Sequence, residues 1–143
     1  VCTARNSVRR VAYAEADDPR VLRAVQTVVD QGLAKPFLIG MEAQVEAAIR
    51  EAGLRLKRDV DYTLVPLESG GDATLLGTRL LQSGQVDALI CGMRGRYDEH
   101  LVHVKNEIGM APGAGVLAAM NALVLDKLTL FITDTYVNDT PSA

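Results

Sequence analysis

Short apolar runs alternate with segments of helical periodicity along this sequence of 143 residues, and this alternation most constrains its fold. An unbroken apolar run suits a buried strand, whereas apolar residues three and four positions apart lie on one face of a helix. A chain that alternates the two builds a mostly parallel sheet, because each parallel connection needs a crossover that a helix can supply. The predicted strands span residues 11–14, 36–40, 62–66 and 86–91.

Four helices are predicted between and after these strands. The first begins at Pro19 behind Asp18, since Asp favours the N-cap position and Pro the first helical position, and it ends at Gly32. The second spans 41–52 and the third 73–82, and the fourth begins near Tyr97.

Two of these elements have apolar residues in a specific pattern. The strand 86–91 is almost entirely apolar and is therefore expected to be buried on both faces of the sheet. The fourth helix is expected to carry apolar residues along one side, and these are Tyr97, Leu101, Val104 and Ile108.

The pattern changes after Pro112 and Gly113. Two apolar runs, 116–125 and 128–133, are separated only by Asp126 and Lys127. A two-residue separation predicts a β-hairpin, although Asp-Lys is not the favoured turn pair. A helix over 116–125 is the competing interpretation, because Ala, Met and Leu favour helices.

Composition excludes several classes of protein. Hydrophobic residues make up 48% of the chain, which is typical of a globular domain, and the net charge of −3 argues against a nucleic-acid surface. No apolar run approaches the roughly 20 residues that a membrane span needs, and no signal peptide is expected. Cys2 and Cys91 lie far apart, without the spacing of a disulfide framework, so a reducing cytoplasmic location is expected.

The loop after the strand 86–91 is the strongest candidate for a binding site. In open α/β sheets, ligands bind at the carboxyl ends of the strands, where helix N-termini present unpaired N–H groups. Gly92 and Gly95 would allow the backbone to approach a ligand, and Arg94 and Arg96 could bind phosphate. A surface turn with two solvated arginines is an equally good interpretation, since neither a dinucleotide fingerprint nor a Walker A motif is present.

Other polar residues carry weaker signals. His100 and His103 lie three positions apart on one helix, but a metal site would need more ligands than Asp98 and Glu99 nearby, so two polar-face histidines are favoured. Cys91 is interpreted as a small buried hydrophobic residue.

Two further candidates follow the last predicted strand. Asp134 and Asn138 could be polar site residues, and a capped turn explains them about equally well.

Four segments, in order, carry a resemblance to a known family. They are RVAYAEADDPRVLRAVQTVVDQGLAKPFLIG, LLGTRLLQSGQVDALICG, GRYDEHLVHVKNEIGMAPGA and TLFITDTYVNDTPSA. Together they resemble the phosphate acetyl/butyryltransferase domain, and most of all the domain fused behind bacterial NADP-dependent malic enzymes. The run from Arg96 to Leu101 is similar to the malic-enzyme branch, and the family's Asp, Asn and Pro correspond to Asp134, Asn138 and Pro141.

This resemblance implies an α/β fold of three layers with a mostly parallel sheet. Residues 1–143 would form an incomplete domain, the N-terminal part of a two-lobe structure whose second half carries the family's catalytic Ser, Arg and Asp. No catalytic residue is therefore assigned to this chain. Relatives have a longer excursion where this chain has only PLESGGD between Val65 and Ala73, and Val102 stands where the free-standing enzymes have an Arg.

Three functions follow from the resemblance. The leading one is an acyl-CoA-sensing regulatory domain of a malic enzyme, with acetyl-CoA as effector and Gly92, Arg94, Gly95, Arg96, Asp134 and Asn138 as ligand-binding residues. The parent's NADP and divalent metal would lie in other domains, and this chain would hold no cofactor. The alternatives are a phosphate acetyl- or butyryltransferase and a structural oligomerisation domain. The expected partners are an acyl-CoA or phosphate and further copies of the chain, without nucleic acid or membrane.

Overall fold

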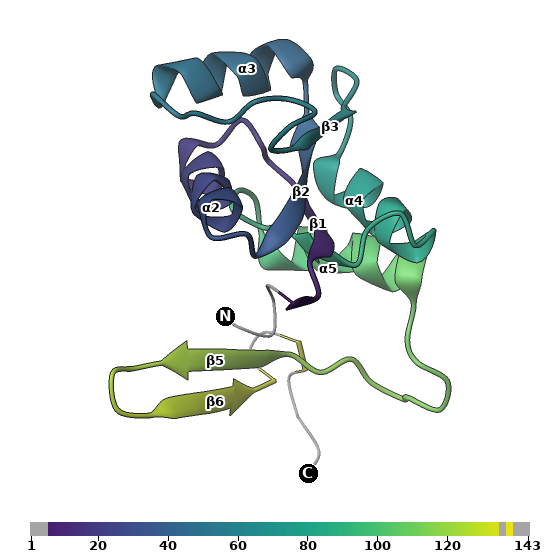
Figure 1. Cartoon of the computed structure of the whole chain (residues 1–143). Coiled ribbons are helices and arrows are strands. Elements are labelled where there is room, and N and C mark those ends of the chain that lie inside the picture. Colours follow the sequence, from purple (N-terminus) through teal and green to yellow (C-terminus); the bar gives the residue numbers. More distant parts are fainter. Residues whose placement is uncertain (1–5, 135–136, 139–143) are drawn as a thin grey trace. The chain divides into compact units, whose positions relative to one another are not determined.

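The chain folds into two units, Val1–Ile108 and Gly109–Ala143. A computed structural model describes residues 6–134 and 137–138 (Figure 1). The first unit contains a parallel sheet with its helices, and the second contains a hairpin. Within the described residues, no helix is both long enough and apolar enough to span a bilayer.

The sheet of the first unit has four strands, and every neighbouring pair is parallel. Their order is β3-β2-β1-β4. The chain therefore adds β2 and β3 on one side of β1 and then crosses back to place β4 on the other side of β1. This confirms the predicted α/β fold with a mostly parallel sheet. The strands are β1 (Arg9–Tyr13), β2 (Ala34–Gly40), β3 (Thr63–Pro66) and β4 (Ala88–Ile90).

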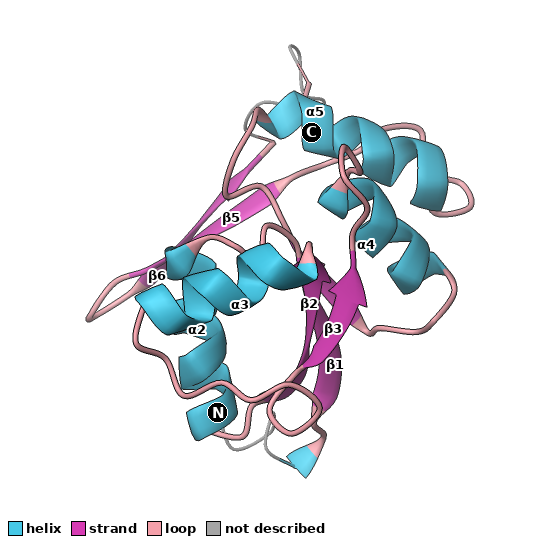
Figure 2. Ribbon diagram, turned by 90° about the horizontal axis from the view of Figure 1, so that it is seen from above, coloured by secondary structure: helices cyan, strands magenta, loops and turns pink. Residues whose placement is uncertain are grey.

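Helices cover both faces of this sheet and make three layers (Figure 2). Side chains alternate along each strand, so Leu38 of β2 packs with α2 and α3 whereas Ile39 packs with α4 on the opposite face. The helices are α2 (Pro19–Asp30), α3 (Glu42–Glu51), α4 (Ala73–Gln82) and α5 (Tyr97–His103), the last continuing as the π-helical turn η1 (Val104–Ile108).

Both ends of α2 form as the sequence predicts. The carboxylate of Asp18 accepts a hydrogen bond of 2.8 Å from the backbone N–H of Arg20, and Pro19 follows as the first helical residue. At the other end Gly32 has a positive φ of 62°, and Leu33 N–H donates to Val28 O at 3.0 Å, which is a Schellman ending. The predicted apolar face is buried at Val21, Leu22 and Val25 and half-buried at Val28 and Val29.

The prediction for the strand 86–91 is wrong in one respect. Only Ala88–Ile90 is regular strand, and it lies at the edge of the sheet, paired with β1 alone among the described strands. Ile90 is consequently 54% exposed, whereas Val86, just before the strand, is buried with the core that faces α4. The apolar composition of this strand indicates that at least one of its faces is covered by the core. Whether its free edge is paired with another strand depends on the strand order of the sheet.

The apolar side of the fourth helix is only partly covered in the structure. Tyr97 and Ile108 are exposed while Leu101 and Val104 are half-buried. The side that faces α4 carries His100, His103 and Glu107. Polar contacts with α4 decide this orientation, and an apolar stripe cannot predict them.

The second unit contains the predicted hairpin. β5 (Met120–Val124) and β6 (Thr129–Thr133) pair antiparallel, with Val124 opposite Thr129 (Figure 1). Leu125 N–H donates to Leu128 O at 2.9 Å around the two-residue connection. The hairpin prediction is therefore confirmed, and the alternative helix over 116–125 is wrong.

Candidate functional site

A cleft of about 500 Å³ lies in the first unit, at the carboxyl ends of its strands. The loops after β1, β2, β3 and β4 line it, together with the first turns of α4 and α5. Because the chain turns outward from β1 and returns to β4, these two strands form a topological switch point, the place where open α/β sheets bind ligands. The cleft therefore includes part of the loop after β4 that the sequence singles out.

Arg94 connects the two loops at this switch point. Its Nη1 lies 2.9 Å from Oδ2 of Asp17 in the loop after β1, and its Nε lies 3.6 Å from Oδ2 of Asp18. The hydrogen bond to Asp17 raises the pKa of Arg94 above its ordinary value. Arg94 and Asp17 both line the cleft, so the guanidinium at the cleft surface is already paired with a carboxylate.

Asp18 is fully engaged within the protein. Its carboxylate accepts from the backbone N–H and the guanidinium of Arg20, and the side chain is almost completely buried. These hydrogen bonds from Arg20 hold the pKa of Asp18 well below its usual range. Asp18 therefore stays ionised and caps the N-terminus of α2. It is not among the residues that line the cleft.

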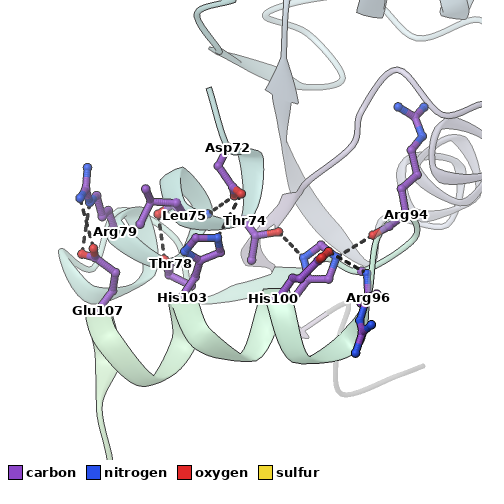
Figure 3. A network of polar contacts seen from close by, with 12 residues as sticks. Asp72, Thr74, Leu75, Thr78, Arg79, Arg94, Arg96, His100, His103 and Glu107 are labelled. Atoms are coloured by element: carbon purple, nitrogen blue, oxygen red, sulfur yellow. Dashed lines mark hydrogen bonds and ion pairs between the residues drawn. The ribbon is translucent and has the colours of Figure 1, made fainter. Parts of the chain in front are cut away.

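His100 fixes the loop after β4 against α4 (Figure 3). Its Nε2 lies 2.6 Å from the carbonyl oxygen of Arg94, and its Nδ1 lies 2.7 Å from Oγ1 of Thr74. A carbonyl oxygen can only accept, so Nε2 carries the proton and, in the neutral ring, Nδ1 accepts from the Thr74 hydroxyl. A Cβ at Gly95 would lie 3.2 Å from this Nε2, and the φ of 79° there also favours glycine.

His103 makes a second contact with α4. Its Nε2 donates to Oδ2 of Asp72 at 3.0 Å, while Oδ1 of Asp72 caps α4 by accepting from Leu75 N–H at 2.8 Å. One turn further along, the guanidinium of Arg79 binds the carboxylate of Glu107 (Figure 3). Both histidines thus join helices and line the cleft, a role that the sequence pattern does not reveal because their partners lie 26 and 31 residues away.

Glu15 has a strained position at the base of the same loop pair. Its φ is 50°, in the left-handed region that glycine favours, and its Oε1 accepts from Gly92 N–H at 3.3 Å. Its Oε2 is buried and has no hydrogen-bond partner among the described residues. Burial, and next the charge of Glu15, raise the pKa of the Cys91 thiol, so this thiol is protonated, but it is half-buried where the sequence predicts a buried residue.

Metal binding finds no support in the described part of the chain. No three His, Cys, Asp or Glu side chains there are placed to hold a metal ion together. The two histidines near Asp98 and Glu99 instead bind Thr74 and Asp72.

The predicted ligand-binding residues fall in two places. In the first unit, Arg94 and Gly95 line the cleft, and Gly92 lies in the same loop with its N–H bound to Glu15. The guanidinium of Arg96 binds Asp98 instead, with both bonds at 3.0 Å, and its side chain is 75% exposed and outside the cleft lining. Figure 3 shows the side chains of Arg94 and Arg96 leaving the loop in opposite directions.

The remaining predicted residues belong to the second unit. Nδ2 of Asn138 donates to the carboxylate of Asp134 at 2.7 Å and 2.9 Å and to Leu117 O at 2.8 Å. The pair is therefore a local polar contact around the end of β6, as a capped turn would be. Pro141 lies outside the described residues.

Comparisons with known proteins connect this cleft to a family. The profile of the family described as phosphate acetyl/butaryl transferase matches residues 1–69 and 67–143. The two matches meet in the connection between β3 and α4, where the sequence has only PLESGGD between Val65 and Ala73.

The relatives include malic enzymes. The chain is 37% identical over 169 residues to an NADP-dependent malic enzyme of Escherichia coli (strain K12), covering 98% of this chain and 22% of that enzyme. It is 35% identical over 170 residues to an NAD-dependent malic enzyme of Rhizobium meliloti (strain 1021), with the same coverage. The chain thus spans about a fifth of the length of these curated relatives.

A solved structure shares the fold. The EutD phosphotransacetylase from Staphylococcus aureus superposes with a TM-score of 0.80 at 14% identity, covering 98% of this chain and 50% of that one. The likeness establishes the arrangement of helices and strands, while membership follows from the profile that matches both units of the sequence. The chain belongs to the phosphate acetyl/butaryl transferase family.

Proposed function

We propose that this chain is an acyl-CoA-binding regulatory domain of a malic enzyme, with acetyl-CoA as its effector. The observation that carries the proposal is the cleft of about 500 Å³ at the switch point between β1 and β4, in a chain related to malic enzymes over nearly its whole length. A site of this size and position suits part of a cofactor-like ligand. Oxidative decarboxylation of malate, with NADP and a divalent metal, would take place in other parts of such a protein.

The groups that line the cleft support binding of an anionic ligand at its rim. Arg94 is the arginine there, and a guanidinium can bind a phosphate through two parallel hydrogen bonds. Arg96, the other predicted cation, is bound to Asp98 and points away from Arg94. Arg94 is therefore the residue that we expect to contact a phosphate of the ligand.

The second candidate is a phosphate acetyl- or butyryltransferase, which family membership favours. Acyl transfer needs hydrogen-bond donors aimed at the oxyanion that develops at the reacting carbonyl. In the loop after β4, the N–H of Gly92 binds Glu15 and the guanidinium of Arg94 binds Asp17. With these donors bound to carboxylates, none of them is aimed at a reacting carbonyl, so we keep transfer as the second candidate.

Titration calorimetry of the 143-residue chain with acetyl-CoA tests the leading function. We expect saturable binding that weakens about tenfold in Arg94→Ala, since a charge-assisted hydrogen bond contributes about 1.5–3 kcal/mol. Arg96→Ala is the matched control, because this arginine lies in the same loop but outside the cleft, and its affinity should stay near that of the wild type.

A parallel assay separates the two candidates. Acetyl-CoA and phosphate are incubated with the chain, and release of free CoA is followed. Binding without release supports a regulatory domain, release above a matched blank supports the transferase, and neither binding nor release contradicts both.

A further inference from the structure

The carboxylate of Asp17 is bound to Arg94, the arginine that an anionic ligand in the cleft would need. Nη1 of Arg94 lies 2.9 Å from Oδ2 of Asp17, and among the described lining residues Arg94 is the one arginine or lysine. The loops after β1 and β4 are joined by this contact at the switch point. A ligand phosphate that binds Arg94 must therefore compete with Asp17.

The ion pair between Arg94 and Asp17 is weak enough for a ligand to replace Asp17. The side chains of Arg94 and Asp17 are 49% and 31% exposed, and ion pairs in partly solvated positions are weak. The second carboxylate near Arg94, that of Asp18, lies 3.6 Å away and already binds Arg20 at 2.8 Å. Asp17 is thus the main partner of Arg94.

The backbone around the contact is anchored independently of it. The carbonyl oxygen of Arg94 is bound by His100, which is itself bound to Thr74 of α4. On the other side, Asp18 and not Asp17 caps α2. The Arg94 side chain can consequently turn from Asp17 to a ligand while the loop and the helix keep their positions.

We propose that Asp17 determines the specificity of the cleft by competing with the ligand for Arg94. A carboxylate is a monoanion with two acceptor oxygens, whereas a phosphate group carries up to two charges and three acceptor oxygens. A phosphate can therefore displace Asp17 from the guanidinium of Arg94. A simple carboxylate cannot, because it has the same charge and the same number of acceptor oxygens as Asp17. Asp17 would thus admit phosphate-bearing ligands and exclude small monoanions, which deepens the proposed acyl-CoA site and rests on it.

The test compares Asp17→Asn with a matched variant elsewhere. Asp30 binds Arg55 through two contacts of 3.0 Å in the same unit, but neither residue lines the cleft, so Asp30→Asn removes a similar ion pair without touching the site. Acetyl-CoA, inorganic phosphate and acetate are titrated separately by calorimetry at one low salt concentration. Melting curves establish that both variants fold.

We expect Asp17→Asn to bind acetyl-CoA and phosphate about three- to fivefold more tightly than the wild type, the range that a partly exposed ion pair allows. Acetate should bind measurably only to this variant. Asp30→Asn should match the wild type with all three probes. In the double variant Asp17→Asn, Arg94→Ala the gain should disappear.

Each other result overturns a defined part of the proposal. Unchanged phosphate and acetyl-CoA affinity in Asp17→Asn rejects the competition, while acetyl-CoA binding to the wild type leaves the proposed function standing. A gain that persists without Arg94 shows a general effect of net charge and also rejects it. If phosphate behaves as expected but no variant binds acetyl-CoA, the competition stands and the acyl-CoA function fails. If neither probe binds any variant, both are wrong.

Discussion

The hydroxyl of Thr74 lies 2.7 Å from Nδ1 of His100, and this contact joins the first turn of α4 to the helix that follows the cleft loop. Thr74 is buried, and this contact satisfies its hydroxyl within the protein. The other ring nitrogen of His100 binds the carbonyl oxygen of Arg94. One side chain thus connects α4 to the cleft loop after β4.

His100→Ala should loosen the loop 92–96 without unfolding the unit. Losing the bond to the Arg94 carbonyl removes about 1 kcal/mol of local stabilisation, which corresponds to roughly fivefold faster amide hydrogen exchange in the loop. Exchange measured by NMR or mass spectrometry checks this. His103→Ala is the control, because His103 binds Asp72 and not the loop, and equal exchange in both variants would contradict the role of His100.

Gly77→Ala should destabilise the first unit although alanine favours helices. A Cβ at Gly77 would lie 2.5 Å from Cδ1 of Leu89 and 3.2 Å from Cδ1 of Ile39, so the Leu89 side chain would have to shift or α4 would have to move away from the sheet. Overpacking costs about 1–3 kcal/mol, which exceeds the gain of about 1 kcal/mol in helix propensity. Urea unfolding measures the difference, and adding Leu89→Val should recover part of the loss because it removes the nearest methyl groups.

Asp18→Ala should lower the melting temperature by about 3–5 °C, the shift that the loss of about 1 kcal/mol from a helix cap produces in a domain of this size. The carboxylate of Asp18 caps α2 and holds the guanidinium of Arg20. Asp18→Asn keeps the capping oxygen and should lie between alanine and the wild type. Equal melting temperatures for all three proteins would show that the cap contributes nothing.

Asp87 should make the first unit sensitive to acid. Hydrogen bonds from the side chain and backbone of Arg10 lower the pKa of Asp87 to about 2. Because the folded state holds this carboxylate ionised, its stabilisation is complete above the unfolded pKa of about 3.9 and is lost as the pH falls through about 2.

Asp87→Asn should therefore be less stable than the wild type at pH 7, and the difference should vanish near pH 2. Melting temperatures across this range provide the measurement. In an Arg10→Met background the same substitution should have less effect, since the side-chain hydrogen bonds that contribute most to the pKa shift are gone while the backbone N–H of residue 10 still donates to Asp87. A difference that is independent of pH would exclude the carboxylate as its source.

Local pattern predicts the elements of this protein well. The bounds 73–82 of α4 and both ends of α2 follow from caps and periodicity, and the hairpin follows from two apolar runs separated by two residues. These features depend on neighbours within a few positions, which is the range over which hydrogen bonding in helices and tight turns operates.

The position of the candidate site also follows from sequence, because glycines and arginines after a strand predict a ligand loop at the sheet's carboxyl edge. The identity of its contacts does not. Arg94 and Arg96 have the same chemistry and nearly the same context in the sequence, yet only Arg94 lines the cleft, because the loop sends their side chains in opposite directions.

The sequence by itself thus determined the alternation of strand and helix, the caps and the family. Tertiary structure alone decided that β4 lies at the edge of the sheet, that α5 faces α4 through its histidines, and that Arg94 meets Asp17 from 77 residues away. The physical reason is the strand order β3-β2-β1-β4, which brings the loops after β1 and β4 together. Periodicity within one segment carries no information about which distant segment becomes its neighbour.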